Sequence, residues 1–216
     1  MSIDPRIPSP SEIVDFWLGS PEPGNSAAVM AMVQRLSATL DDEIRERFGA
    51  LVQLGFDGGL TSWEKTPEDL VALILVLDQF PRHIFRGTAK QYEGGPRALR
   101  LALAAVDAGW LSGRTPLQRI FLSMPLVHSE SLEVQRKNLV IADGNAASCP
   151  AWFGAFAAIG PAQARKYIRV IEKFGRFPHR NAMLGRENTE AEQAWLDAGN
   201  AELMSPDVLR EPPATE

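Results

Sequence analysis

Three short polar stretches, each marked by a proline, contain all three histidines of this 216-residue chain. Each stretch also carries arginines or a carboxylate beside an apolar segment. Imidazole titrates near neutral pH, and guanidinium groups bind phosphate or carboxylate with a fork of donors. If the stretches meet in space, they therefore form a pocket for a small anion. The stretches are residues 78–86, 125–130 and 176–186, and the histidines are His83, His128 and His179.

The roles of the side chains in such a pocket follow from their chemistry. The acid–base candidates are His128, Glu130 and Asp78, since a histidine paired with a carboxylate can move a proton. The sequence leaves open whether a reaction occurs, so the chain is not assigned as an enzyme. The ligand-binding candidates are Gln79, Arg82, Arg86, Ser129, Arg176, His179, Arg180, Asn181 and Arg186.

Other chemistries are disfavoured by the spacing of the residues. A metal site built from the same side chains lacks the His-Glu-x-x-His pattern or any comparable ligand spacing. Ser129 lacks a nucleophile-elbow motif, and the Gly-Gly pairs at 58–59 and 94–95 lack the flanks of a phosphate-binding loop. The lone Cys149 excludes an internal disulfide framework and a cysteine zinc site. We therefore expect no metal and no cofactor.

Two alternatives to a small-molecule site stay open. The basic residues could line an open groove that binds an acidic peptide or protein segment. They could also form buried ion pairs that fix helix ends and bind no ligand. The three hypotheses imply different structures, namely a closed pocket with some arginines accessible, a basic groove, or arginines that are all paired and dry.

Basic residues gather in the second half of an otherwise acidic chain. The net charge is −5, yet residues 160–186 contain seven Lys or Arg residues against Glu172 alone. This block is short and lacks an aromatic stacking platform, so a nucleic-acid partner is not expected. The N-terminus lacks the order of a signal peptide, and no apolar run has the length that a bilayer requires. We expect a cytoplasmic protein without a membrane partner.

One helix must position the first polar stretch. Thr66 is a predicted N-cap, Pro67 fits the first helical position, and residues 70–77 are all apolar. A helix without a polar face lies in a protein core. Pro81 should end or kink this helix, which leaves the polar residues at its C-terminal end.

The remaining segments also predict helices. Nothing alternates with a period of two, so the class is all-α, with antiparallel neighbours in a single domain over residues 1–203 and a loose tail over 204–216. Capping boxes at Ser9-Pro10-Ser11-Glu12 and Thr189-Glu190-Ala191-Glu192 open the first and last helices. Thr115-Pro116 opens another helix, which Pro125 should interrupt. Further helices are expected over residues 27–38, 41–54, 96–108, 151–159 and 161–175, and from Ser129 or Ser131 to about Ala142.

The longest motifs resemble one known family. They are Leu77-Asp78-Gln79-Phe80-Pro81-Arg82, Pro125-Leu126 with His128-Ser129-Glu130, Phe174-Gly175-Arg176-Phe177-Pro178-His179-Arg180-Asn181, and Phe16-Trp17. Together they resemble the bacterial DUF924 family over almost the whole chain. The resemblance implies a fold similar to right-handed tetratricopeptide-repeat superhelices, although the signature residues of that repeat are absent. It brings no established activity, but it supports grouping the three polar stretches in one site.

Two residues depart from the family pattern. His83 stands where members more often have asparagine, and Tyr167 stands where a histidine is expected on the helix before Phe174. A role that requires a histidine at position 167 is therefore not expected in this chain.

Overall fold

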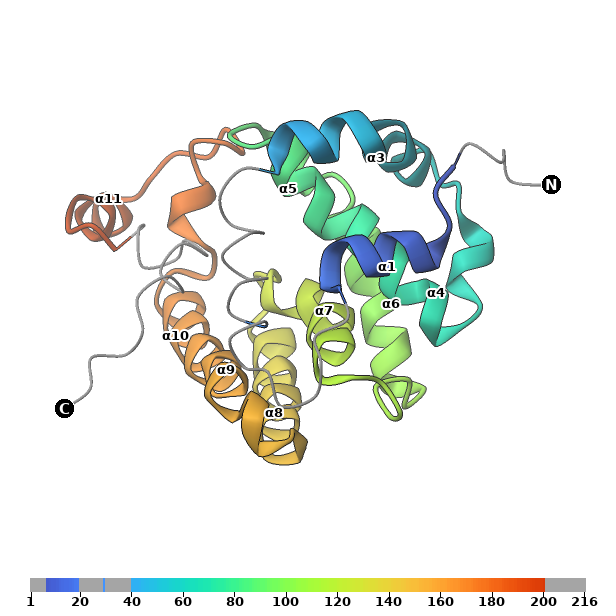
Figure 1. Cartoon of the computed structure of the whole chain (residues 1–216). Coiled ribbons are helices and arrows are strands. Elements are labelled where there is room, and N and C mark those ends of the chain that lie inside the picture. The colour runs from blue at the N-terminus through green and yellow to red at the C-terminus, as the bar shows by residue number, and fades with distance from the viewer. Residues whose placement is uncertain (1–6, 20–28, 30–39, 201–216) are drawn as a thin grey trace.

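Every regular element in the part of the chain that the structure describes is helical (Figure 1). The structure is a computed structural model that describes residues 7–19, 29 and 40–200. The all-α class is confirmed, whereas the tetratricopeptide-like superhelix and the domain boundary stay predictions. The helix predicted over residues 27–38 and the tail predicted from residue 204 lie outside the described residues. The α-helices are α1 (Pro10–Leu18), α3 (Asp41–Phe56), α4 (Pro67–Ile74), α5 (Phe80–Ile84), α6 (Gly95–Asp107), α7 (Pro116–Val127), α8 (Leu132–Ser148), α9 (Gly154–Ala157), α10 (Ile159–Phe174) and α11 (Glu190–Asp197).

The predicted start signals cap their helices. Ser9 and Glu12 form a reciprocal capping box at α1, and Thr189 and Glu192 form another at α11. The Thr66 hydroxyl accepts a hydrogen bond from a backbone N–H in the first turn of α4 (3.2 Å). These bonds satisfy N–H groups that have no partner inside a helix, which explains why the helices begin at these residues.

The central helix continues through Pro81 instead of ending there, because a π turn precedes the proline. The turn, η2, spans Leu75–Gln79, and the N–H of Phe80 bonds to the carbonyl oxygen of Leu75. This wider turn places Pro81 in the first turn of α5, where the missing N–H costs no hydrogen bond. Gly94 packs directly on this π turn, since a Cβ at Gly94 would lie 2.2 Å from the carbonyl oxygen of Leu77 in the turn.

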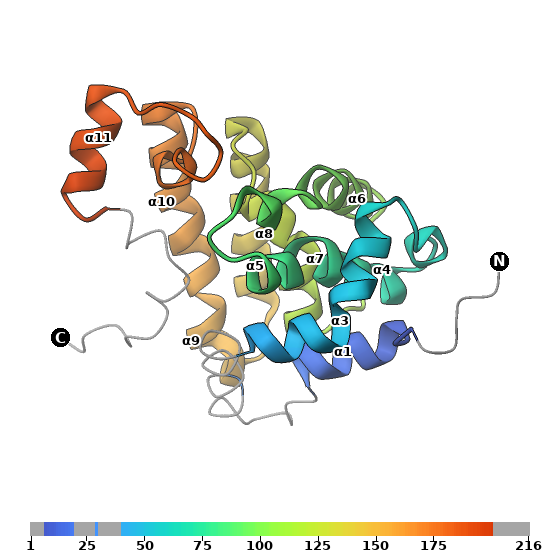
Figure 2. The same ribbon diagram turned by 90° about the horizontal axis from the view of Figure 1, so that it is seen from above.

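The continuous unit from α4 to α5 is the centre of the N-terminal half. Its residues from Leu70 to Leu77 are all buried, as the sequence predicts. Helices α1, α3, α6 and α7 pack around it, and α8 and α10 lie side by side beyond α7 (Figures 1 and 2). The chain therefore brings the end of the central helix close to the start of α8 and the segment after α10.

Two helices extend beyond their predicted ends. Helix α7 includes Pro125 and ends at Val127, and the side-chain amide of Gln135 donates to the carbonyl oxygens of Val127 (2.8 Å) and Ser129 (2.7 Å) just beyond it. This buried amide stabilises the C-terminal end that the proline weakens. Helix α8 runs to Ser148 and not to Ala142, and its cap is Ser131 rather than Ser129. None of the helices in the described ranges has the length and apolar character to cross a membrane.

Candidate functional site

The buried carboxylate of Asp78 is the centre of the polar cluster at the end of the central helix. It is 2% exposed and accepts hydrogen bonds from Gln79 Nε2 (2.6 Å) and Arg82 Nη2 (3.1 Å), while one of its oxygens lies 2.8 Å from Nδ1 of His128. Burial raises the pKa of Asp78, but the charges of and hydrogen bonds from His128 and Arg82 lower it more. Asp78 is therefore ionised at neutral pH.

His128 follows the last residue of α7 and presents an available ring nitrogen. Because Nδ1 faces the Asp78 carboxylate, we assign the hydrogen of the neutral ring to Nδ1. Nε2 then carries a lone pair, and none of the described residues hydrogen-bonds to it. Burial, Arg82 and Arg180 together lower the pKa of His128 to about 4, although the charge of and hydrogen bond to Asp78 oppose them. At neutral pH the ring is a neutral hydrogen-bond acceptor beside two cations.

Two guanidinium groups meet at one aromatic ring. The Cζ atoms of Arg82 and Arg180 lie 5.4 Å and 5.2 Å from the centroid of Tyr92, which belongs to the short helix η3 (Ala89–Tyr92). Arg180 also lies over the Phe177 ring at 4.4 Å and donates to the carbonyl oxygen of His128 (2.8 Å). We call Asp78, Arg82, Tyr92, His128 and Arg180 the Arg82–Arg180 site.

The site carries more positive than negative charge. Arg82 pairs with Asp78, but none of the described carboxylates forms an ion pair with Arg180. Burial and repulsion from Arg82 together lower the pKa of Arg180 to about 10. Arg180 nevertheless stays protonated at neutral pH. Two guanidinium charges against one carboxylate leave a net charge of +1 in a largely buried cluster.

His179 and Tyr167 border the same site. Burial and the neighbouring Arg180 lower the pKa of His179 to about 4, so its ring is neutral as well. Its Nδ1 atom is buried and has no hydrogen-bond partner. The Tyr167 ring packs edge-on against Phe177 with centroids 5.3 Å apart, and its hydroxyl accepts a hydrogen bond from Gln163 (2.9 Å). Tyr167 therefore lies beside the site, in contact with the ring that also carries Arg180.

Glu130 forms no hydrogen bond with His128. Instead it holds the loop after α10 against the start of α8. Its two carboxylate oxygens accept hydrogen bonds from Arg186 at 2.7 Å and 3.0 Å, and one also accepts from the Phe177 N–H (2.9 Å). Burial raises its pKa, but Arg186 and this N–H lower it below the usual value. The geometry gives Glu130 and Arg186 a role in holding the loop that carries Arg180.

Two further candidates hold the C-terminal segment in place, and a third supports the turn before α8. Arg176 forms a two-pronged ion pair with Glu192 of α11 (2.6 Å and 2.7 Å). Asn181 is fully buried and donates to the side chain of Asn188 (2.8 Å). The Ser129 hydroxyl accepts from the backbone N–H of Ser131 (3.1 Å) in the turn before α8.

Arg86 lies in a separate cluster at the start of α3. Its guanidinium forms two hydrogen bonds with Asp41 (2.8 Å and 2.9 Å), and Nδ1 of His83 lies 2.8 Å from the same carboxylate. The His83 ring also contacts Trp17, with centroids 5.4 Å apart. The first polar stretch is thus divided, with Asp78, Gln79 and Arg82 in the Arg82–Arg180 site and the later residues bound to α3.

The arrangement suits binding and proton transfer rather than metal binding. Two arginines can hold an anion, and an imidazole nitrogen to which none of the described residues hydrogen-bonds can accept a proton or hydrogen bond from it. In the described ranges there is no group of three or more His, Cys, Asp or Glu side chains that could hold a metal ion.

Sequence reasoning missed Tyr92 and Gln163. Tyr92 follows the first polar stretch by several residues, and its contacts depend on how η3 folds back over Arg82. One signal was present, because Tyr92 and Tyr167 are the two tyrosines of the chain and both border this site.

Comparison with known proteins identifies relatives without a known activity. The chain is similar to a solved protein of unknown function, ATU0120 from Agrobacterium tumefaciens, with 29% sequence identity and a TM-score of 0.68. The match covers 88% of this chain and 97% of the other. A search of curated proteins gives no match. The sequence profile of the DUF924 family, described as bacterial proteins of unknown function, matches residues 13–200, and the chain therefore belongs to that family.

Proposed function

We propose that this protein binds a small anionic molecule between Arg82 and Arg180. The observation that carries the proposal is the guanidinium of Arg180, which is largely buried, lacks a carboxylate partner among the described residues and lies beside a second guanidinium on Tyr92. A buried charge without a counter-charge is costly, and a bound carboxylate or phosphate would remove that cost. Because the cluster has a net charge of +1, it favours a negatively charged ligand.

His128 supplies the second half of the proposed site. Its Nδ1 is held by Asp78, so Nε2 is oriented and available to accept a hydrogen bond or a proton from the bound molecule. The carboxylate–histidine pair is the arrangement that a general base requires, and an anion at the two arginines would offset the charges that weaken this base. The only chemical step that we propose at His128 is the acceptance of a proton at Nε2.

The competing structural hypothesis fits a different subset of arginines. Arg86, Arg176 and Arg186 each form two-pronged pairs with a carboxylate, and these pairs hold α3, α11 and the loop after α10. Arg82 has one hydrogen bond to a carboxylate, and Arg180 has none. The division between paired and unpaired arginines therefore favours a ligand at Arg82 and Arg180.

Thermal unfolding with inorganic phosphate, sulfate or acetate tests the proposal. A ligand at one hundred times its dissociation constant stabilises the folded state by about 2.7 kcal/mol, which raises the melting temperature by several degrees. We expect this shift in the wild type and in Arg169→Ala, which removes an exposed arginine on the same basic segment. We expect no shift in Arg180→Ala. An equal shift in Arg180→Ala would show that the anion binds elsewhere.

A further inference from the structure

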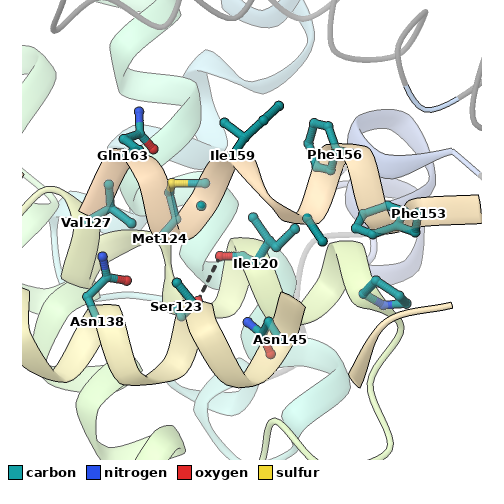
Figure 3. Close-up of a pocket in the computed structure, with 14 residues that line it drawn as sticks. Ile120, Ser123, Met124, Val127, Asn138, Asn145, Phe153, Phe156, Ile159 and Gln163 are labelled. Atoms are coloured by element: carbon teal, nitrogen blue, oxygen red, sulfur yellow. Dashed lines mark hydrogen bonds between the residues drawn. The ribbon is translucent and has the colours of Figure 1, made fainter. Parts of the chain in front are cut away.

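A second feature of the molecule is an apolar cavity between α7, α8, α9 and α10 (Figure 3). It has a volume of about 100 Å³, and Ile120, Met124, Phe156 and Ile159 form much of its wall. A cavity of about 150 Å³ with such a lining can hold a benzene ring. This cavity therefore has room for a short apolar group.

One polar side chain also belongs to the cavity wall. Asn138 on α8 is 3% exposed and lines the cavity. Figure 3 shows its amide on the same side of the cavity as Val127. The wall is therefore mostly apolar, with a polar group towards the end near Val127.

The cavity and the Arg82–Arg180 site lie on the same helix faces. On α7, Ile120 and Met124 line the cavity, and His128 is the next residue at a spacing of four. On α10, Ile159 and Gln163 line it, and Tyr167 is the next residue at that spacing. Residues four apart are neighbours on one helix face.

The two helix faces advance in the same direction along the cavity. In Figure 3 the series from Ile120 through Met124 to Val127 runs parallel to the series from Phe156 through Ile159 to Gln163. The end of the cavity near Val127 and Gln163 is therefore the end that faces the polar site, one helical turn or about 5.4 Å further on.

Direct contacts join the two features at this end. Gln163 lines the cavity and donates to the Tyr167 hydroxyl (2.9 Å). The Tyr167 ring packs against Phe177 (5.3 Å between centroids), and the Arg180 guanidinium lies over the same Phe177 ring (4.4 Å). Val127, which also lines the cavity, directly precedes His128 in the sequence.

We propose that the ligand is an amphipathic anion whose charged head lies between Arg82 and Arg180 and whose short apolar tail lies in the cavity of α7–α10. This inference rests on the proposed anion site and adds the chemical class of its ligand. A tail of a few carbon atoms matches the volume, and a carboxylate or a phosphate head matches the guanidinium pair.

Calorimetric titration of the full chain with acetate, butyrate and hexanoate tests the tail. Transfer of one methylene from water is worth a factor of roughly three to four in affinity, so we expect hexanoate to bind at least tenfold more tightly than acetate. Hexyl phosphate, compared with hexanoate, shows which head the site prefers. Equal affinities of acetate and hexanoate would overturn the inference and leave the proposed anion site standing.

Two variants separate the head from the tail. Ala142→Phe fills the cavity from α8, and we expect it to abolish the gain from chain length while acetate still binds. Ala147→Phe adds the same bulk on the exposed face of α8 and should leave the gain unchanged. Arg180→Ala should lose binding of every anion. Circular dichroism and melting of each variant establish that it is folded.

The remaining outcomes are also decisive. If Ala142→Phe keeps the full dependence on chain length, the tail lies elsewhere and the inference is wrong. If 1-hexanol binds as tightly as hexanoate, the cavity acts without the arginines and the inference is again wrong. If neither phosphate nor any carboxylate binds to the wild type, the anion site itself is wrong.

Discussion

Nδ1 of His128 lies 2.8 Å from Oδ2 of Asp78, although the two residues are 50 positions apart in the sequence. This contact joins the end of the central helix to the end of α7. It also fixes the imidazole so that Nε2 stays available. Asp78 therefore has a structural task and a task in the proposed site, because it neutralises Arg82 and orients His128.

Asp78→Asn should destabilise the protein by about 3 kcal/mol, because it leaves Arg82 without its buried counter-charge and removes the charged acceptor of the His128 Nδ1 hydrogen. Urea unfolding of both proteins measures the difference. Asp107→Asn is the matched control, since Asp107 is 68% exposed and its pair with Lys137 (2.6 Å) should contribute less than about 1 kcal/mol. Equal losses of unfolding free energy in the two variants would show that the buried Asp78 pair stabilises the protein no more than an exposed pair does.

The structure divides the candidate residues into those of the Arg82–Arg180 site and those that form ion pairs elsewhere. The apolar run before Asp78 predicts a buried helix, and buried polar residues must then meet partners there. No local sequence pattern predicts which arginine forms an ion pair with a carboxylate. Arg186 meets Glu130 across 56 positions, and Arg180 meets none. Such pairings depend on how distant helices pack.

Errors in the predicted helices have local physical causes. Pro81 and Pro125 both carry a strong signal for a helix break, yet a π turn accommodates the first and the side chain of Gln135 caps the carbonyls after the second. Both compensations involve bonds that a proline rule does not include. The sequence predicts where the helical hydrogen-bond pattern is disturbed but not how the disturbance is repaired.

Gly94→Ala should destabilise the protein by about 1–3 kcal/mol, because its Cβ would lie 2.2 Å from the backbone oxygen of Leu77. This oxygen belongs to the π turn that carries Asp78, so the central helix would have to shift. Gly144→Ala provides the opposite control. Gly144 lies inside α8 with open space around it, and alanine there should stabilise the protein by about 0.5–1 kcal/mol. Chemical denaturation measures both, and a neutral Gly94→Ala would contradict the close contact.

Stability should fall as the pH decreases from about 6.5 towards 4. His128 and His179 have folded-state pKa values of about 4, below the 6.5 of an exposed histidine, so the unfolded chain binds more protons in this window. Above pH 6.5 neither histidine reduces the free energy of unfolding. Below that pH, the free energy of unfolding falls by at most about 1.4 kcal/mol per pH unit for each histidine. Urea midpoints between pH 7.5 and 5 measure this slope.

The double variant His128→Gln/His179→Gln isolates the two histidines in this slope. It should show a flatter dependence on pH than the wild type. His83, whose pKa is lowered by burial, supplies the part that remains. The same slope in the double variant and the wild type would mean that neither ring is held neutral by the fold.

Anion binding should raise the pKa of His128. After burial, Arg82 lowers that pKa most, and Arg180 lowers it as well, so an anion between the two guanidinium groups would cancel part of their effect. Titration of the imidazole nitrogens by NMR, with and without saturating phosphate, measures the shift. The same spectra report whether the hydrogen resides on Nδ1, as the contact with Asp78 requires.

His83 is the internal reference for this titration, because its ring faces Asp41 and Arg86 at the start of α3, away from the Arg82–Arg180 site. Its pKa should not change with phosphate. In Arg180→Ala without ligand, the pKa of His128 should rise, because one of the neighbouring positive charges is gone. If phosphate binds and the pKa of His128 stays constant while that of His83 moves, the anion occupies the α3 cluster and Arg180 is not its partner.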